Sequence, residues 1–273
     1  MAPPDPYISA AEDPSSGRPA TLIFLHGYAD DAEGIPLGKL HSVPSTASSC
    51  QSPTNNPPSG LAQQFQFNHK LPYLTWLLPN AGRHPEAMEN AWYMPKALPN
   101  AQKPRVPGQE EEESAPDDEE GILASCDRID ELVRKELDRG IPKERIIVGG
   151  FSQGCAVSLI WGLLGRERNN VVGMVPLCGY LPLGTARIAA IRKARGYTET
   201  PAKTAETKKW LLGHGDRDVL VPASLFTREK EELGVWVDVE RDVESRLYER
   251  MGHSTSPALL RDMLGWLGKV VPP

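Results

Sequence analysis

Five short apolar runs recur along the chain, separated by longer segments of mixed polarity. Each run is nearly continuous in hydrophobic character, which is typical of strands that are buried on both faces. Such strands form a mainly parallel sheet with helices on both of its faces, so the pattern predicts an α/β fold. The runs are Thr21–Gly27, Leu74–Pro79, Arg145–Phe151, Val171–Gly179 and Lys208–Asp216.

Helical spacing occupies several intervals between these runs. In the segment 121–140, apolar side chains recur at i, i+4, i+7 and i+11, which predicts a crossover helix that is closed by Gly140. A second helix, apolar nearly all round, is predicted to begin at Ser152 and to be buried. A third is predicted over 257–271, with Pro257 in its first turn. The apolar positions of the crossover helix are Ile122, Cys126, Ile129 and Val133.

The remaining segments predict the domain organisation. Residues 1–20 are rich in Pro, Ser and Asp and are expected to form an extended N-terminal arm before a single domain over 21–273. Three flexible insertions are expected in this domain, near 41–60, 104–120 and 184–208. The first is a Ser/Pro/Asn tract, and the third is basic and is expected to be a surface loop over the site. The second holds an acidic run that favours the start of the next helix, with binding of basic partners as the alternative.

Composition narrows the choice of partners and compartment. The formal net charge is −6, and no cluster of Lys and Arg is present, so nucleic acid is not expected as a partner. The four cysteines are too scattered for a disulfide framework or a Cys-x-x-Cys metal pair, which favours a reducing compartment. No signal peptide and no apolar run of membrane-spanning length is evident. We therefore expect a cytosolic protein, with a nuclear location as the alternative, and no stable membrane anchor; homodimer formation is left open.

The segment Gly149–Cys155, GGFSQGC, carries the candidate chemistry. A serine between two glycines, placed where a predicted strand meets a predicted helix, is the pattern of a nucleophile elbow. Gly150 and Gly154 suit that turn because it leaves no room for side chains on either flank. The turn would expose the hydroxyl of Ser152 and direct the helix N-terminus at an anion formed there. A turn without chemistry is the alternative.

A serine hydroxyl becomes nucleophilic only when a base removes its proton and a carboxylate orients that base. In α/β-hydrolases these groups follow the serine in the order acid, then histidine. Asp216 and Asp218 stand at the carboxyl end of the last apolar run, and His253 follows a further predicted strand. These residues leave two candidates for the acid and one for the base.

The other histidines are given structural interpretations. His26 precedes the serine, so it is expected to support the adjacent loop through hydrogen bonds rather than act as the base. His214 is expected to be a packed strand residue. His41, His69 and His84 lie in or near predicted loops and are expected at the surface.

Five blocks of the chain resemble the phospholipase/carboxylesterase family of small serine hydrolases, whose best-known members are the acyl-protein thioesterases. The blocks are, in order, LIFLHG, GIPKERIIVGGFSQG, LCGYLPL, HGDRDVLVP and MGHS. The resemblance implies an α/β-hydrolase fold and a serine hydrolase that cleaves ester or thioester bonds without a metal or cofactor. The family's triad acid belongs to an Asp-x-x-Val-Pro motif, which selects Asp218. Its nucleophile and base fall on Ser152 and His253, and its oxyanion hole on the backbone N–H groups of Tyr28 and Gln153.

The resemblance also implies a substrate class. An S-acylated (palmitoylated) protein is expected first, with lysophospholipids as a related long-chain substrate. A carboxylesterase for short soluble esters is the alternative enzyme, and a binding protein without turnover is the alternative from another class. An apolar groove for a fatty chain is expected to use four residues, for which core packing is the alternative. They are Trp92, Tyr93, Leu181 and Leu183.

Overall fold

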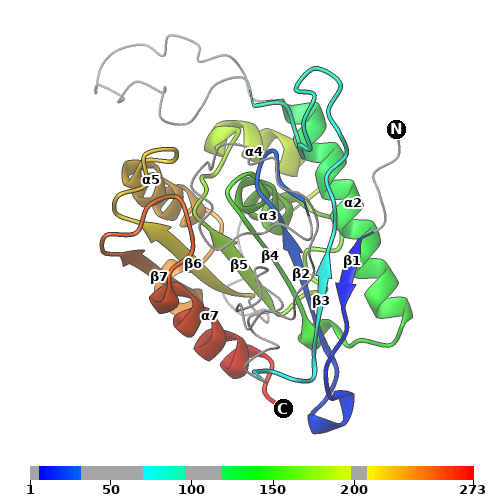
Figure 1. The fold of residues 1–273 in the computed structure, drawn as a ribbon. Coiled ribbons are helices and arrows are strands. Elements are labelled where there is room, and N and C mark those ends of the chain that lie inside the picture. The colour runs from blue at the N-terminus through cyan, green and yellow to red at the C-terminus, as the bar shows by residue number, and fades with distance from the viewer. Residues whose placement is uncertain (1–5, 32–69, 96–117, 198–207) are drawn as a thin grey trace, which may run out of the picture.

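A seven-stranded sheet forms the centre of the molecule (Figure 1). The computed structural model describes residues 6–31, 70–95, 118–197 and 208–273. The strand order is β1-β3-β2-β4-β5-β6-β7, and only the pair of β1 with β3 is antiparallel. The mainly parallel sheet predicted from the sequence is therefore confirmed. The strands are β1 (Tyr7–Ser9), β2 (Ala20–Leu25), β3 (Leu74–Leu78), β4 (Ile146–Phe151), β5 (Gly173–Leu177), β6 (Lys209–Gly215) and β7 (Val243–Tyr248).

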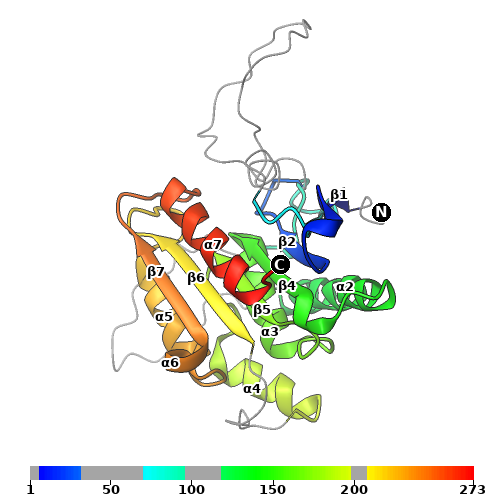
Figure 2. The same ribbon diagram turned by 90° about the horizontal axis from the view of Figure 1, so that it is seen from below.

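Helices lie on both faces of the sheet (Figure 2). One face is covered by α7, and the other by α2, α3, α4 and α5. Within the described part of the chain, no helix is both long and apolar enough to span a membrane. The helices are η1 (Pro14–Ser16), α2 (Glu119–Asp138), η3 (Lys143–Arg145), α3 (Gln153–Leu164), α4 (Gly184–Ala194), α5 (Ala223–Leu233), α6 (Val239–Asp242) and α7 (Pro257–Val270).

The central strands are buried on both faces, as their sequence predicts. In β2, Leu22 and Phe24 pack in the cluster on the α7 side of the sheet. Ile23 and Leu25, whose side chains alternate with them, pack in the cluster that includes α2 and α3. Burial of apolar side chains on both faces is worth about 25 cal/mol per Å², so it supplies most of the free energy that holds the layers together.

The two predicted internal helices form with the expected faces. The four apolar side chains of α2 at i, i+4, i+7 and i+11 are fully buried. Asp118 caps this helix by accepting a hydrogen bond from the Gly121 N–H, and Gly140 ends it with a φ of 88°. All residues of α3 are buried, so the helix that follows Ser152 runs through the interior.

Two predictions about irregular segments are corrected. The expected loop at 184–208 contains α4, which buries Ile188 and Ile191 against the core. Only two buried apolar positions stand among basic residues there, so the helical pattern was weak. The expected N-terminal arm includes β1, which joins the sheet edge by pairing with β3. The predicted insertion at 41–60, and most of that at 104–120, lie outside the described residues.

Candidate active site

Ser152 lies between the end of β4 and the start of α3, with a φ of 56°. This left-handed backbone places the side chain at the carboxyl edge of the sheet. The turn is as tight as its glycines suggest: a Cβ at Gly150 would overlap the backbone of Gly154, and one at Gly154 would overlap the carbonyl oxygens of Leu25 and His26. The local sequence therefore folds as a strand–turn–helix elbow with serine at its tip.

Replacing Gly154 by alanine should destabilise the protein. The new Cβ would meet backbone atoms of β2 and its loop, which cannot move aside as a flexible side chain would. We expect the free energy of unfolding, measured by urea denaturation, to fall by about 2 kcal/mol. Gly265→Ala is the matched control, because this exposed glycine in α7 has no atom within 4 Å of an added Cβ. That control should be stabilised by roughly 0.5–1 kcal/mol; equal effects of the two substitutions would contradict the prediction.

Three side chains from separate loops form one chain of hydrogen bonds. Ser152 Oγ lies 2.8 Å from His253 Nε2, and His253 Nδ1 lies 2.6 Å from Asp218 Oδ2. A carboxylate only accepts, so Nδ1 carries the proton and Nε2 is left to accept from the serine hydroxyl. The Asp218 side chain is fully buried, whereas the His253 side chain keeps 13% of its surface exposed. This arrangement allows a proton to pass from the serine to the histidine.

The structure separates the two candidate acids. Asp218 follows β6, and its Oδ1 accepts hydrogen bonds from the backbone N–H groups of Leu220 and Val221, at 2.9 and 2.8 Å. These bonds leave Oδ2 facing His253. Asp216 is exposed, and its backbone N–H donates to the Tyr248 carbonyl. Of the two carboxylates, Asp218 is the one that contacts the histidine.

The loop after β2 approaches the serine from the other side. An added Cβ at Gly27 would lie 3.4 Å from the Ser152 Cβ, so the backbone that leads to Tyr28 passes directly over the serine. His26 holds this loop: its Nδ1–H donates to the Gly27 carbonyl at 2.7 Å, and its Nε2 accepts from the Ala81 N–H at 2.9 Å. Burial lowers the pKa of His26, which favours the neutral ring that this bonding pattern requires.

The predicted oxyanion donors lie on this loop and on the elbow. Gln153 opens α3, and the first N–H groups of a helix have no partner within the helix. No hydrogen bond joins the backbone N–H of Tyr28 or Gln153 to another described residue. The Tyr28 side chain is 41% exposed, so its ring stands at the surface of the site. Burial raises the pKa of the nearby Asp30 to about 6, so at neutral pH that carboxyl is mostly charged.

The segment 90–93 connects the two donor loops. The Trp92 indole N–H donates to the His26 carbonyl, and the Trp92 backbone N–H donates to the Gln153 side chain. The Asn90 carbonyl accepts from the Ala29 N–H, and the Gln153 side-chain amide donates to the Tyr93 carbonyl. This supporting role was not predicted from the sequence. Nothing in a Trp-Tyr pair shows whether its side chains hold loops by hydrogen bonds or only line an apolar groove.

The four residues expected to line an acyl groove pack in or against the core, which is the alternative given for them from the sequence. Trp92, Tyr93 and Leu181 have 2–4% of their surface exposed and belong to the main core cluster. Leu183 is partly buried and packs against that cluster. Large apolar side chains can fill a core as well as a groove, and here three of the four fill the core.

Strained backbone is concentrated near the site. Among the non-glycine residues with positive φ, four follow strands at the carboxyl edge of the sheet. Each such conformation costs about 1–2 kcal/mol in a residue with a Cβ, so it persists only where the surroundings impose it. These residues are Ala29, Ser152, Cys178 and Arg250, with φ between 53° and 59°.

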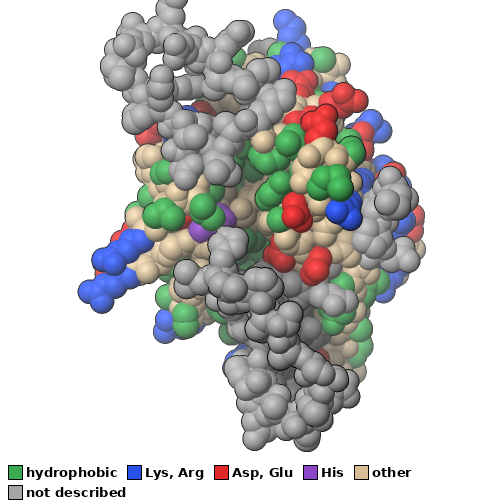
Figure 3. Space-filling view, turned by 45° about the horizontal axis from the view of Figure 1, so that its top comes forward, with side chains coloured by type: hydrophobic (Ala, Val, Ile, Leu, Met, Phe, Trp, Pro, Cys, Tyr) green, Lys and Arg blue, Asp and Glu red, His purple; other side chains and the backbone are tan. Residues whose placement is uncertain are grey.

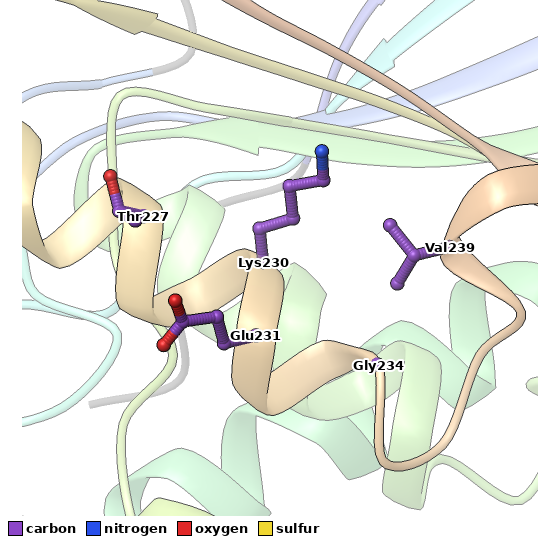
Figure 4. Close-up of a pocket in the computed structure, with 5 residues that line it drawn as sticks. All are labelled: Thr227, Lys230, Glu231, Gly234 and Val239. Atoms are coloured by element: carbon purple, nitrogen blue, oxygen red, sulfur yellow. The ribbon is translucent and has the colours of Figure 1, made fainter.

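Part of the His253 side chain reaches the surface, since 13% of it is exposed. Figure 3 shows histidine atoms at the surface of the molecule with hydrophobic side chains beside them. A separate pocket lies beside α5, where the Lys230 and Val239 side chains face one space (Figure 4). No residue predicted for the site lines that pocket. Its lining is Thr227, Lys230, Glu231, Gly234 and Val239.

Comparisons with known proteins agree with this fold. Residues 55–271 match the model of the phospholipase/carboxylesterase family. The chain is 34% identical to acyl-protein thioesterase 1 of Mycosarcoma maydis over 95% of both chains. It is 26% identical to acyl-protein thioesterase 1 of Yarrowia lipolytica over 96% of both.

Solved structures show the same fold at lower identity. Acyl-protein thioesterase 2 of Zea mays superposes with a TM-score of 0.64 at 22% identity, covering 97% of this chain and 98% of that one. A carboxylesterase of Bacillus cereus superposes with a TM-score of 0.61 at 14% identity, covering 97% and 93%. The predicted α/β-hydrolase fold and the suspected family are both confirmed. The chain belongs to the phospholipase/carboxylesterase family and is a hydrolase of ester or thioester bonds.

Proposed function

We propose that the protein is an acyl-protein thioesterase in which Ser152, His253 and Asp218 form the catalytic triad. The observation that carries this proposal is the continuous hydrogen-bond chain from Ser152 Oγ through both His253 nitrogens to Asp218 Oδ2. A buried carboxylate beside Nδ1 stabilises the imidazolium that forms when the histidine takes the serine proton. The elbow supplies the exposed hydroxyl, and the helix N-terminus faces the charge that develops.

The reaction proceeds through an acyl-enzyme. Ser152 Oγ attacks the thioester carbonyl carbon while His253 Nε2 accepts its proton, and the carbonyl oxygen becomes an oxyanion. The imidazolium then gives that proton to the departing thiolate as the C–S bond breaks. Water attacks the acyl-serine with the same base, and the fatty acid leaves with Ser152 restored.

Two backbone N–H groups, those of Tyr28 and Gln153, receive the oxyanion in this proposal. Both belong to tightly bonded segments: His26 fixes the loop before Tyr28, and the Gln153 side chain is bonded to the segment 90–93. Donors that are already held in place cost no reorganisation during the reaction, and each is worth roughly 3 kcal/mol of barrier. Their rigidity supports this role.

The names of the relatives support S-acylated proteins as the substrate, with lysophospholipids as a second long-chain class. One observation favours a different candidate, a carboxylesterase for short soluble esters. Three of the four residues expected to line an acyl groove, Trp92, Tyr93 and Leu181, are buried in the core instead. With those side chains unavailable, a site of this fold has less apolar surface to offer to a long chain.

The dependence of kcat/KM on acyl length distinguishes the two candidates. Matched thioesters and oxygen esters of increasing chain length are compared, with Ser152→Ala as the blank. For a thioesterase we expect kcat/KM to rise about fourfold with each methylene that the transition state buries, up to long chains. A maximum at short acyl chains would reject the thioesterase and support the carboxylesterase. Hydrolysis that persists in the Ser152→Ala blank would overturn the proposed triad.

A further inference from the structure

A second histidine lies behind the candidate triad. His214 is the sixth residue of β6, it is fully buried, and its ring stacks on Phe226 of α5 with centroids 5.3 Å apart. The sequence predicts this residue to be a packed strand side chain, and its burial agrees with that prediction. Its hydrogen bond, however, is directed at the loop that presents Asp218.

The partners of His214 determine its protonation. Nε2 lies 2.8 Å from the Val221 carbonyl oxygen, which can only accept, so Nε2 carries a proton. Nδ1 is buried and has no hydrogen-bond partner among the described residues. Burial lowers the pKa of His214, which favours the neutral ring with its proton on Nε2.

Val221 connects this histidine to the acid. Its carbonyl accepts from His214, while its own N–H donates to Asp218 Oδ1 at 2.8 Å. Val221 is therefore held from both sides, and Pro222, which follows it, begins the turn into α5. Asp218 can direct Oδ2 at His253 only while Oδ1 stays on the N–H groups of this loop.

His214 also lies close to the carboxylate without bonding to it. Its Nε2 is 3.6 Å from Asp218 Oδ2, which is too long for a hydrogen bond. Because the ring is neutral, it does not compete with His253 for the charge of Asp218. The arrangement therefore reserves Oδ2 for a single partner.

We propose that His214 is a positioning residue for the acid of the triad: by fixing the Val221 carbonyl, it holds the Asp218 loop in the orientation that serves His253. This inference rests on the proposed function, because it takes His253 as the base. It adds a fourth side chain to the site, one that never touches the substrate. Its failure and that of the triad can be told apart by experiment.

The test compares two substitutions of His214 by the pH dependence of kcat/KM. His214→Phe removes the donor to Val221, so we expect kcat/KM per active site to fall on the order of tenfold or more. In the profile of kcat/KM against pH, the acid limb is the rise in rate as His253 loses its proton. This limb should move about one pH unit lower, because a misplaced carboxylate stabilises the imidazolium less. In His214→Gln, the side-chain N–H lies the same number of bonds from Cβ as the histidine Nε2–H, so it can donate to the Val221 carbonyl. This variant should recover most of the wild-type kcat/KM and the wild-type position of the acid limb.

Phe226→Leu is the control for lost packing. It removes the ring that stacks on His214 but leaves the bond to Val221, so it should lower stability without moving the acid limb. Active sites are counted by fluorophosphonate titration, so misfolded protein does not count as lost rate. A His214→Phe variant with an unmoved limb and an unchanged rate per active site would overturn the inference while leaving the triad intact. If wild type shows no Ser152-dependent hydrolysis, the proposed function itself fails.

Discussion

Ser152→Ala is expected to lower kcat by about 10⁶-fold, because the acyl-enzyme can no longer form. The remaining donors and the binding surface leave only a small residual rate. Fluorophosphonate labelling should also disappear, since the probe reacts with the activated hydroxyl. Stability should change little: Ser152 makes its side-chain hydrogen bond only to His253 among the described residues, and alanine has the same backbone cost at a φ of 56°.

Ser158→Ala provides the matched control for this experiment. Ser158 lies on α3, the helix that Ser152 precedes. It is fully buried and donates its hydroxyl hydrogen to the carbonyl of Cys155, three residues before it. This variant should keep both the labelling and the hydrolysis of wild type. Labelling that survives in Ser152→Ala would place the nucleophile elsewhere, and a properly folded wild type without any labelling would favour a binding protein that has lost turnover.

Asp218→Asn is expected to lower kcat by about 10⁴-fold, as loss of the charged triad acid does in other serine hydrolases. The reason lies in the direction of the hydrogen bonds. The N–H groups of Leu220 and Val221 require an acceptor, so the asparagine oxygen takes the place of Oδ1 and its NH₂ group faces His253. His253 Nδ1 must then accept, its proton moves to Nε2, and Nε2 can no longer take the proton of Ser152.

The same substitution at Asp216 separates this effect from a general loss of charge. Asp216 lies two residues away, is exposed, and is not the carboxylate bonded to His253. Asp216→Asn should therefore retain kcat within about twofold. Steady-state rates at several pH values suffice for the comparison; if the two variants lost activity equally, the assignment of the acid would be wrong.

Much of the fold could be predicted from the sequence, because its signals are local. Strands buried on both faces leave continuous apolar runs, as β2 and β4 do, and α2 repeats its apolar positions at helical spacing. The elbow is equally readable, since its sharp turn demands small flanking residues and so marks the serine with a glycine on either side. The β1 strand and α4 were missed because each contributes too few buried side chains to set a pattern.

The finer features of the site depend on contacts between distant segments. Asp216 and Asp218 stand two residues apart, and the pattern of residues alone left both open until the family's Asp-x-x-Val-Pro motif selected Asp218. The hydrogen bond between His253 and Asp218, with those from Leu220 and Val221, shows which carboxylate faces the histidine. The residues that support the site are harder to predict. Trp92 holds the loop after β2 by donating its indole N–H to the His26 carbonyl, and nothing in the sequence around Trp92 indicates that partner. The sequence therefore left only a groove or core packing as roles for Trp92.

The residues with left-handed backbone at the carboxyl edge of the sheet limit where substitutions can raise the thermal stability of this protein. Ala29, Ser152, Cys178 and Arg250 hold backbone conformations that a chain selected only for thermal endurance would give to glycine. Natural proteins keep such costs where activity requires a fixed geometry, and recover them elsewhere. Searches for heat-tolerant variants should therefore concentrate on exposed helical positions such as Gly265, and leave this edge unchanged.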